Sequence, residues 1–168
     1  VALRLQGASP QDAQPIPSAG RGAPLPLSLA QQRLWFLTQM EGASEAYHIS
    51  GAVRLRGPLD TGALRRALLT IVQRHETLRT RYTQVDGQPR QVIAPQAVLD
   101  LREHVLAEGQ DAAALLEAHA AETFDLENGL PLRLLLARRG ADDHLLQVVM
   151  HHIAADGWSI GVLLGEFG

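Results

Sequence analysis

Met150 to Ser159 reads MHHIAADGWS, and the chain is organised around this stretch. The residues from 145 to 153 are mostly apolar and rich in branched side chains, and they lie between acidic turn residues, so we expect a buried strand there. Asp156 is a candidate N-cap of a following helix, whose apolar residues recur every three or four positions. These residues are Ile160, Leu163, Leu164 and Phe167. The paired histidines are therefore predicted to lie where a strand passes into a helix.

Successive side chains of a strand point to opposite faces of its sheet. His152 is therefore expected to share a face with Met150, and His151 to share the opposite face with Val149. Only one of the two imidazoles can then point into a given site.

Three interpretations of this stretch remain open on the residues alone. In the first, the histidines hydrogen-bond within the sheet and Asp156 only caps the helix. The second is a metal site, which is disfavoured because neighbouring strand histidines face opposite ways and no further ligand lies at a suitable spacing. In the third, an imidazole with a pKa of about 6.5 accepts the proton of an amine or hydroxyl that attacks a thioester.

Three segments, in the same order, resemble motifs of the condensation domains of nonribosomal peptide synthetases. MHHIAADGWS resembles the HHxxxDG active-site motif, with Ala155 where the family often has Ser. SLAQQRLWFL at 28–37 resembles the first motif, SxAQxRLWxL, and RHETLRTRY at 74–82 resembles the second, RHExLRTxF. The resemblance covers about 24–167.

The interleaved helices and hairpin-linked strands predict an α+β, mixed α/β sandwich. The resemblance implies the N-terminal lobe of a chloramphenicol acetyltransferase-like fold over 27–168, without the C-terminal lobe. It also implies peptide-bond formation between a donor acyl or peptidyl thioester and an acceptor aminoacyl amine. Two peptidyl carrier domains would present the donor and the acceptor as thioesters on 4′-phosphopantetheine arms. An adjacent adenylation domain is a further expected partner. Asp-Gly-Trp-Ser favours condensation over heterocyclisation or epimerisation, and the first motif favours an L-configured donor.

The same resemblance implies the catalytic residues. His152 is expected to position the amine and accept its proton, and His151 to support it from the opposite face. Asp156 is expected to hold the loop by pairing with an arginine, for which Arg33 is the candidate in this chain. Gly157 leaves the backbone accessible, and its N–H near a helix N-terminus is expected to help bind an oxyanion. No cofactor or metal is expected to bind these residues directly.

Other conspicuous residues have ordinary structural interpretations. Trp35 is expected in the core, and His75 at the end of a helix whose apolar stripe it closes. His119 has no partner at a recognisable spacing. The arginines of the second motif are expected to form local ion pairs and caps; they are Arg74, Arg79 and Arg81.

The remaining elements follow from caps, turns and periodicity. Ser28 and Gln31 form a capping box that starts a helix reaching about residue 40, and Asp60 opens a second helix. Asp86-Gly87 suits a tight hairpin turn between two strands within 78–93. Further expected elements are a strand at 47–55, a helix at 111–123 and a strand at 132–137.

The chain has 168 residues, a net charge of -3 and no cysteine, which excludes disulfides and thiolate sites. Neither nucleic acid nor a membrane is favoured as a partner, and a cytoplasmic location is expected. Residues 1–26 hold five of the nine prolines and are expected to be a linker, which the resemblance implies leads from an upstream carrier domain. The chain is expected to belong to a longer polypeptide.

Two further classes of protein compete with this interpretation. His151 and Asp156 also fit the HxxxxD of glycerolipid acyltransferases, and His152 and Asp156 fit the HxxxD of plant-type acyltransferases, but neither family explains 28–37 or 74–82. A non-enzyme alternative is a degenerate lobe that only recruits carrier domains or a tailoring enzyme. The intact His152, Asp156 and Gly157 argue against it.

Overall fold

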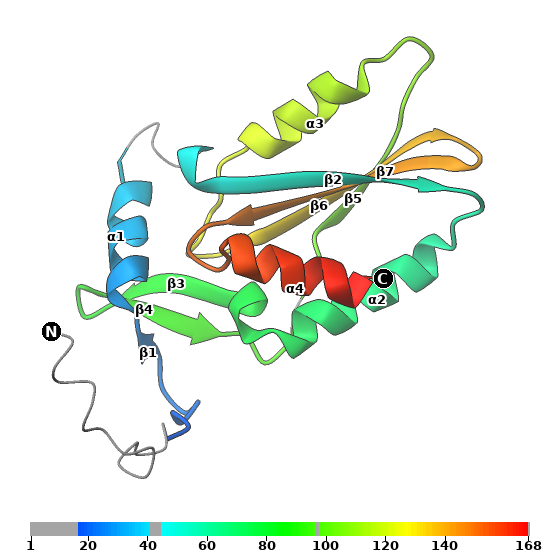
Figure 1. Ribbon diagram of the computed structural model, residues 1–168. Helices are drawn as coiled ribbons and strands as arrows, with labels where there is room; N and C mark the ends of the chain where they lie inside the picture. Colours follow the sequence, from blue (N-terminus) through cyan, green and yellow to red (C-terminus); the bar gives the residue numbers. More distant parts are fainter. Residues whose placement is uncertain (1–16, 41–44, 97, 168) are drawn as a thin grey trace, which may run out of the picture.

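The computed structural model of the chain describes residues 17–40, 45–96 and 98–167 (Figure 1). A four-stranded sheet has the order β2-β7-β6-β5, and a smaller sheet has the order β1-β4-β3. The strands are β1 Leu25–Pro26, β2 His48–Arg56, β3 Thr80–Val85, β4 Gln88–Ile93, β5 Leu101–Val105, β6 Leu132–Gly140 and β7 Asp143–His151. The helices are α1 Leu29–Thr38, α2 Thr61–Arg74, α3 Ala112–Ala121 and α4 Gly157–Phe167, with 3-10 turns η3 Glu45–Tyr47 and η4 Glu76–Arg79.

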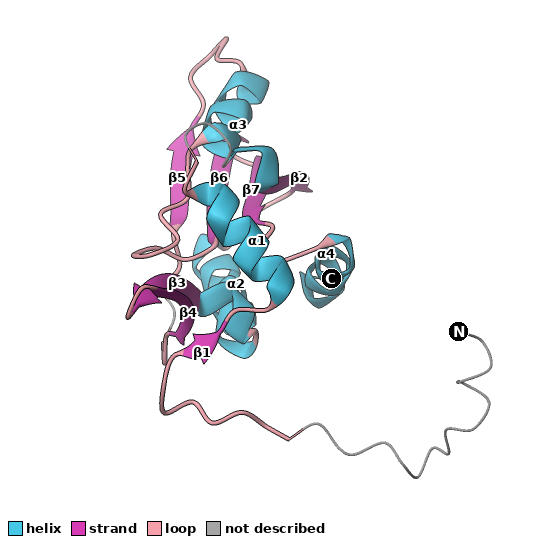
Figure 2. Ribbon diagram, turned by 90° about the vertical axis from the view of Figure 1, so that its left-hand side faces the viewer, coloured by secondary structure: helices cyan, strands magenta, loops and turns pink. Residues whose placement is uncertain are grey.

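The four-stranded sheet is the middle layer of a mixed α/β sandwich. Helix α3 covers one face, and α2 and α4 cover the other (Figures 1 and 2). The β2-β7 and β7-β6 pairs are antiparallel, whereas β6-β5 is parallel. The predicted fold class is therefore confirmed.

The main core lies between the sheet and the α2/α4 layer. Alternate residues of β6 and β7 point into it, because strand side chains alternate between faces. Each fully buried leucine side chain there contributes about 1.5–3 kcal/mol of transfer free energy. Its buried members include Leu68, Ile71, Val72, Leu132, Leu134, Leu136, Leu146 and Met150, against which Ile160, Leu163 and Phe167 of α4 pack.

The predicted helix starts and hairpin are confirmed. Ser28 and Gln31 form a reciprocal capping box at α1. The Asp60 carboxylate accepts a hydrogen bond from the Ala63 N–H (2.9 Å) at the start of α2. Asp86 and Gly87 have φ angles of 53° and 73° between β3 and β4, the left-handed conformation that a two-residue hairpin turn requires.

The strand predicted at 145–153 is shifted, because β7 runs from Asp143 to His151. His152 thus lies in the turn after the strand, and the prediction that it shares a strand face with Met150 was wrong. The alternation does hold for His151, which is buried on the α3 side. The side chain of Leu164 and residues 1–16 of the predicted linker lie outside the described residues.

Two strands were not predicted. β5 carries charged, exposed Arg102 and Glu103, so its apolar pattern is weak, and its pairing with β6 determines its conformation. Leu25–Pro26 forms β1 against β4, which joins the end of the proline-rich segment to the folded part. Among the described residues no helix is long and apolar enough to cross a membrane.

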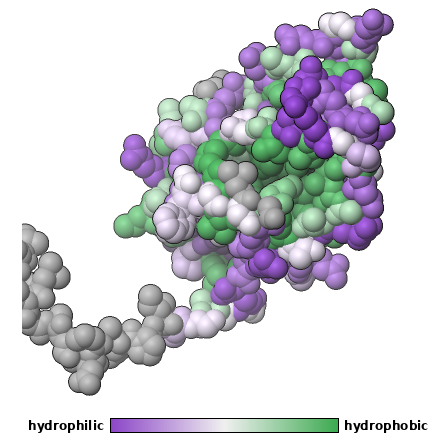
Figure 3. All heavy atoms as spheres, turned by 45° about the vertical axis from the view of Figure 1, so that its right-hand side comes forward, coloured by the Kyte–Doolittle hydropathy of each residue, from purple (hydrophilic) through white to green (hydrophobic). Residues whose placement is uncertain are grey.

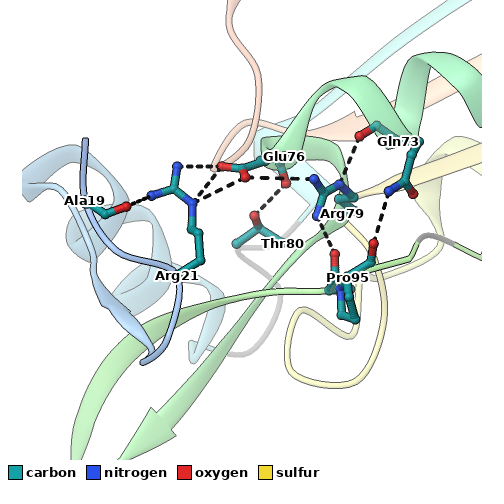
Figure 4. A network of polar contacts seen from close by, with 8 residues as sticks. Ala19, Arg21, Gln73, Glu76, Arg79, Thr80 and Pro95 are labelled. Atoms are coloured by element: carbon teal, nitrogen blue, oxygen red, sulfur yellow. Dashed lines mark hydrogen bonds and ion pairs between the residues drawn. The ribbon is translucent and has the colours of Figure 1, made fainter.

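The second motif forms a network of local contacts around Glu76 (Figure 4). The Glu76 carboxylate accepts a hydrogen bond from Arg21 Nη2 at 2.7 Å and lies 3.8 Å from Arg79 Nη2. The Arg21 bond is the main reason that the pKa of Glu76 is lowered. Arg79 also donates to the carbonyl oxygens of Gln73 and Ala94. The contacts therefore confirm the expected ion pair of Arg79.

The other two arginines of this motif differ from each other. Arg74 forms an ion pair, but the pair is not the local one expected: its Nη1 lies 3.2 Å from a carboxylate oxygen of Glu166 on α4. Arg81 has no ion pair among the described residues, and the expectation was wrong there.

Candidate active site

The HHIAADG stretch spans the end of β7, a turn and the start of α4. His151 N donates to the carbonyl oxygen of Pro131 (3.0 Å), and His152 N donates to that of Tyr47 (2.8 Å). Ala154 N then donates to the carbonyl oxygen of His151 (3.0 Å), which closes the turn. Segments from both sides of β7 thus fix the backbone that carries the two histidines.

His151 is fully buried, with 0% of its surface exposed. Its Nδ1 accepts a hydrogen bond from the Ile153 N–H (3.1 Å), so Nδ1 carries no proton and the neutral ring is protonated at Nε2. Burial, reinforced by repulsion from His48 and His152, lowers the pKa of His151 to about 4. His151 therefore remains neutral at physiological pH and locks the turn.

Two rings enclose His151 on the α3 side of the sheet. The centroids of His48 and Phe124 each lie 5.9 Å from that of His151, at steep interplanar angles. The guanidinium of Arg133 stacks 3.9 Å above the centre of the Phe124 ring. His151 Nε2 is buried without a hydrogen-bond partner among the described residues. No sequence motif marked this cluster, because its members come from separate elements.

His152 has the opposite environment. It is exposed, and its side chain makes no hydrogen bond to any residue in the described part of the chain. Its charge, when protonated, contributes to the lowered pKa of Asp156, so the two side chains are close enough to interact. An exposed imidazole on a fixed turn is suited to meeting an external reactant.

Asp156 is the N-cap of α4, as predicted. Its Oδ1 accepts from the Ser159 N–H (2.9 Å) and from the Ser159 hydroxyl (2.7 Å), and these bonds are the main cause of its lowered pKa. The Asp156 N–H in turn donates to Ser159 Oγ (3.3 Å). Arg33 is exposed on α1 and forms no ion pair with Asp156. Ser159, rather than the proposed Arg33, therefore holds this carboxylate in the described structure.

Gly157 begins α4, where helix geometry leaves its N–H without an intrahelical acceptor. A Cβ atom added at Gly157 would meet no other atom within 4 Å among the described residues. Internal packing therefore does not require glycine here. The accessible backbone at Gly157 leaves room for a substrate or a partner to approach the start of α4.

The three motifs converge on the turn that carries His152. Gln31 of the first motif places its amide nitrogen 3.5 Å from the Tyr82 hydroxyl and 3.4 Å from the Ile153 carbonyl oxygen. The Tyr82 hydroxyl, in the second motif, donates to the same carbonyl (3.3 Å), and burial raises its pKa to about 12. Trp35 is buried in the same cluster, as expected.

A pocket of about 180 Å³ lies behind this turn, and we call it the motif pocket. Most of its walls are apolar, and its residues come from the end of α2, η4, the end of β7, the turn and α4. They are His75, Thr77, Leu78, Met150, Ala154, Ala155, Trp158, Ser159, Val162 and Leu163. His75 is the C-cap of α2, as expected, and its Nε2 donates to Glu166 Oε1 (3.0 Å).

His119 belongs to a buried network that the sequence did not reveal. Its Nδ1 donates to Gln147 Oε1 (2.8 Å), and the Gln147 amide donates to Ser50 Oγ and to the Leu116 carbonyl oxygen. These bonds attach α3 to the centre of the sheet. Within the described ranges no group of three or more His, Cys, Asp or Glu side chains could hold a metal ion.

A family model described as "Condensation domain" matches residues 23–168. The chain is 46% identical over 156 residues to malpibaldin synthetase of Mortierella alpina, and 47% identical over 161 residues to chondramide synthase cmdD of Chondromyces crocatus. These alignments cover 90% and 92% of the chain but only 3% and 4% of the relatives. The chain thus spans a small fraction of the length of the curated relatives it matches.

Solved structures show the same fold. The X-domain from teicoplanin biosynthesis matches with a TM-score of 0.80 and 34% identity, over 89% of this chain and 32% of that one. The first condensation domain of the calcium-dependent antibiotic synthetase matches with a TM-score of 0.74 and 24% identity, over 88% of this chain and 38% of that one. The predicted chloramphenicol acetyltransferase-like fold is confirmed by this similarity.

Proposed function

The chain belongs to the condensation-domain family of nonribosomal peptide synthetases, and we propose that it is the N-terminal lobe of a domain that forms peptide bonds. The observation that carries this proposal is the division of roles between the two histidines. His151 is buried and neutral, whereas His152 is exposed on a turn that backbone hydrogen bonds fix. The alternative of a recruitment-only lobe is not favoured, because the motif is intact and the chain is similar to a synthetase and a synthase.

In the proposed reaction, the acceptor amine attacks the carbonyl carbon of the donor thioester. A C–N bond forms and the C–S bond breaks, so the donor acyl group becomes part of the new amide and the donor's carrier arm is released as a thiolate. An α-amine has a pKa of about 7.7–8.0, so roughly a tenth or more is already neutral at pH 7. His152 therefore acts mainly by orienting the amine, accepting its proton as the tetrahedral intermediate forms, and passing it to the leaving thiolate.

The neighbouring residues have supporting roles in this proposal. His151 holds the turn through Ile153, and Asp156 fixes the start of α4 through Ser159. The Gly157 N–H, at the positive end of α4, would stabilise the oxyanion of the intermediate.

Donor and acceptor would arrive as 4′-phosphopantetheine thioesters on two peptidyl carrier domains, with an adenylation domain supplying the aminoacyl groups. The synthetase relatives support these partners. The linker role of residues 1–26, the preference for an L-configured donor and the cytoplasmic location stay predictions.

The apolar surface beside α4 is an argument that a second lobe packs against this chain. A groove of about 230 Å³ runs between β2, β7 and α4, and Figure 3 shows a hollowed apolar area on this side of the molecule. Its walls include Ile49, Val53, Leu146, Val148, Ile160 and Phe167. An apolar groove on the surface is a candidate site for contact with a partner. We propose that the C-terminal lobe of the same domain covers it.

The test is reconstitution of the complete domain from the parent polypeptide with loaded carriers. Donor-loaded and acceptor-loaded carrier domains are mixed with the domain, and intact-protein mass spectrometry follows the condensed thioester. We expect the donor to move to the acceptor carrier only when His152 is present. Absence of any condensed product with a range of loaded donors and acceptors would overturn the proposal.

A further inference from the structure

We propose that the motif pocket receives the apolar side chain of a carrier-bound aminoacyl group while its reacting carbonyl or amine lies beside His152. This inference rests on the proposed function and specifies the substrate of the same site. It is carried by the position, the size and the polarity of the pocket.

The pocket is continuous with the catalytic turn. Ala154 and Ala155 follow His152 closely in the chain and form part of the pocket wall. Ser159, another wall residue, donates its hydroxyl to Asp156 at 2.7 Å. The turn that carries His152 and the helix start that follows it therefore both contribute to the pocket wall. A side chain attached to a reacting centre at His152 would find this pocket beside the same turn.

The size of the pocket fits one side chain. Its volume is about 180 Å³, and an apolar cavity of roughly 150 Å³ is known to hold benzene. It can therefore take an aliphatic or phenyl side chain, but not a whole aminoacyl-pantetheine. Trp158 lies at the wall with 82% of its surface exposed, so an entering side chain would cover part of the indole.

Two of the polar side chains in the pocket wall, His75 and Ser159, already have partners. His75 Nε2 bonds to Glu166 Oε1 at 3.0 Å, and Arg74 Nη1 lies 3.2 Å from the same oxygen. The Ser159 hydroxyl donates a hydrogen bond to the Asp156 carboxylate. Most of the wall is apolar, and only the Thr77 hydroxyl and the Trp158 N–H in the described part of the wall are left to replace the hydration that a polar side chain would lose, so the pocket favours apolar groups.

The test uses a substitution at the rim that makes the pocket narrower. Val162 lines the pocket from α4 and is 42% exposed, so Val162→Trp can be introduced without filling the core. The matched control is Val105→Trp on β5, because Val105 is 69% exposed and does not line the pocket. Both variants are made in the complete domain and compared with wild type by single-turnover condensation. One arm varies the donor between alanyl, leucyl and phenylalanyl groups, and the other varies the acceptor in the same way.

In one arm, Val162→Trp should lower the rate for leucyl and phenylalanyl groups by about tenfold or more relative to alanyl. Val105→Trp should leave this ratio unchanged. The responding arm identifies whether donor or acceptor uses the pocket. A second variant, Trp158→Ala, should also lower the ratio of leucyl to alanyl rates, because it removes apolar surface from the wall.

Equal slowing of all substrates by Val162→Trp, or no change in either arm, would overturn the inference while leaving the proposed function intact. Failure of the wild-type domain to condense any pair would instead overturn the proposed function. Circular dichroism and thermal melting of each variant separate selectivity from misfolding. If Val162→Trp misfolds, an unchanged leucyl-to-alanyl ratio in Trp158→Ala overturns the inference by itself.

Discussion

At the scale of single residues, burial separates two neighbours of the same type. His151 is buried, and its Nδ1 accepts a hydrogen bond from the Ile153 N–H at 3.1 Å. His152 is exposed and has no such bond among the described residues. Their substitutions should therefore affect different measurable properties.

Replacing His152 with Ala should reduce the single-turnover rate of the complete domain by about 10²–10⁴-fold, the usual contribution of a general acid–base group. The free energy of unfolding should change by no more than about 0.5 kcal/mol, because the side chain is exposed. Rapid-quench kinetics and chemical denaturation measure the two effects. A loss of rate fully explained by unfolding would contradict the assignment of His152.

Replacing His151 should act mainly on stability. Asn can place its side-chain oxygen near the position of Nδ1 and keep the bond to Ile153, whereas Ala leaves that buried N–H without an acceptor. His151→Ala should therefore be less stable than His151→Asn by about 1–3 kcal/mol. Urea denaturation of both variants provides the comparison, and equal stabilities would show that the bond to Ile153 does not matter.

The lowered pKa of His151 predicts a pH dependence of stability. The folded value is about 4 and the ordinary value 6.5, so between these values only the unfolded state binds the proton. Stability is therefore complete above pH 6.5 and falls as the pH decreases toward 4, by on the order of 3 kcal/mol. Burial also lowers the pKa values of His48 and His119, which adds to the fall.

Thermal melting between pH 5 and 6.5 tests this dependence. Carboxylates with lowered pKa values lose their contribution only below their ordinary values of about 4, outside this range. His151→Asn is the control, because it retains the acceptor and lacks the titrating ring. Its melting temperature should fall less steeply with decreasing pH than that of the wild type, and parallel curves would contradict the prediction.

At the scale of elements, the candidate catalytic stretch depends on how a strand ends and a helix begins. The Asp156–Ser159 capping pair starts α4 directly after the turn. Gln31 and Tyr82 reach the same turn from the other two motifs. The three motifs are therefore structurally coupled although they are distant in sequence.

Replacing Asp156 with Ala should lower both stability and activity, since loss of an N-cap costs about 0.5–2 kcal/mol. Asp156→Asn retains the acceptor oxygen and should cost less. Calorimetry measures the stability of both variants, and condensation assays measure activity. A fully stable but inactive Asp156→Asn would assign the carboxylate a direct chemical role instead.

At the scale of the whole molecule, the exposed face beside α4 predicts the behaviour of the 168-residue chain by itself. Without a second lobe, substrates would not be held against His152. The orientation that makes an attack effectively intramolecular, equivalent to about 7–11 kcal/mol in favourable cases, would be lost. We therefore expect no condensed product from this chain alone, and self-association through the apolar groove.

Mass spectrometry of loaded carriers, with and without the C-terminal lobe added in trans, measures product formation, and analytical ultracentrifugation measures self-association. Turnover by the chain alone at a rate near that of the complete domain would contradict the two-lobe proposal.

The sequence by itself determined the elements with strong local signals and the location of the candidate site. Ser28, Asp60 and Asp156 marked helix starts, and Asp86-Gly87 marked a hairpin, because caps and tight turns are formed by residues close in sequence. The tertiary structure decided what depends on distant residues: the pairing of charged β5 with β6, the end of β7 at His151, and the partner of Asp156. It also enclosed His151 between His48 and Phe124, and this burial keeps His151 neutral. The neighbouring His152, in the turn after β7, is exposed. Burial and long-range contacts arise only when separate elements pack, so the strand pattern could separate the two imidazoles by side but could not show which of them is buried.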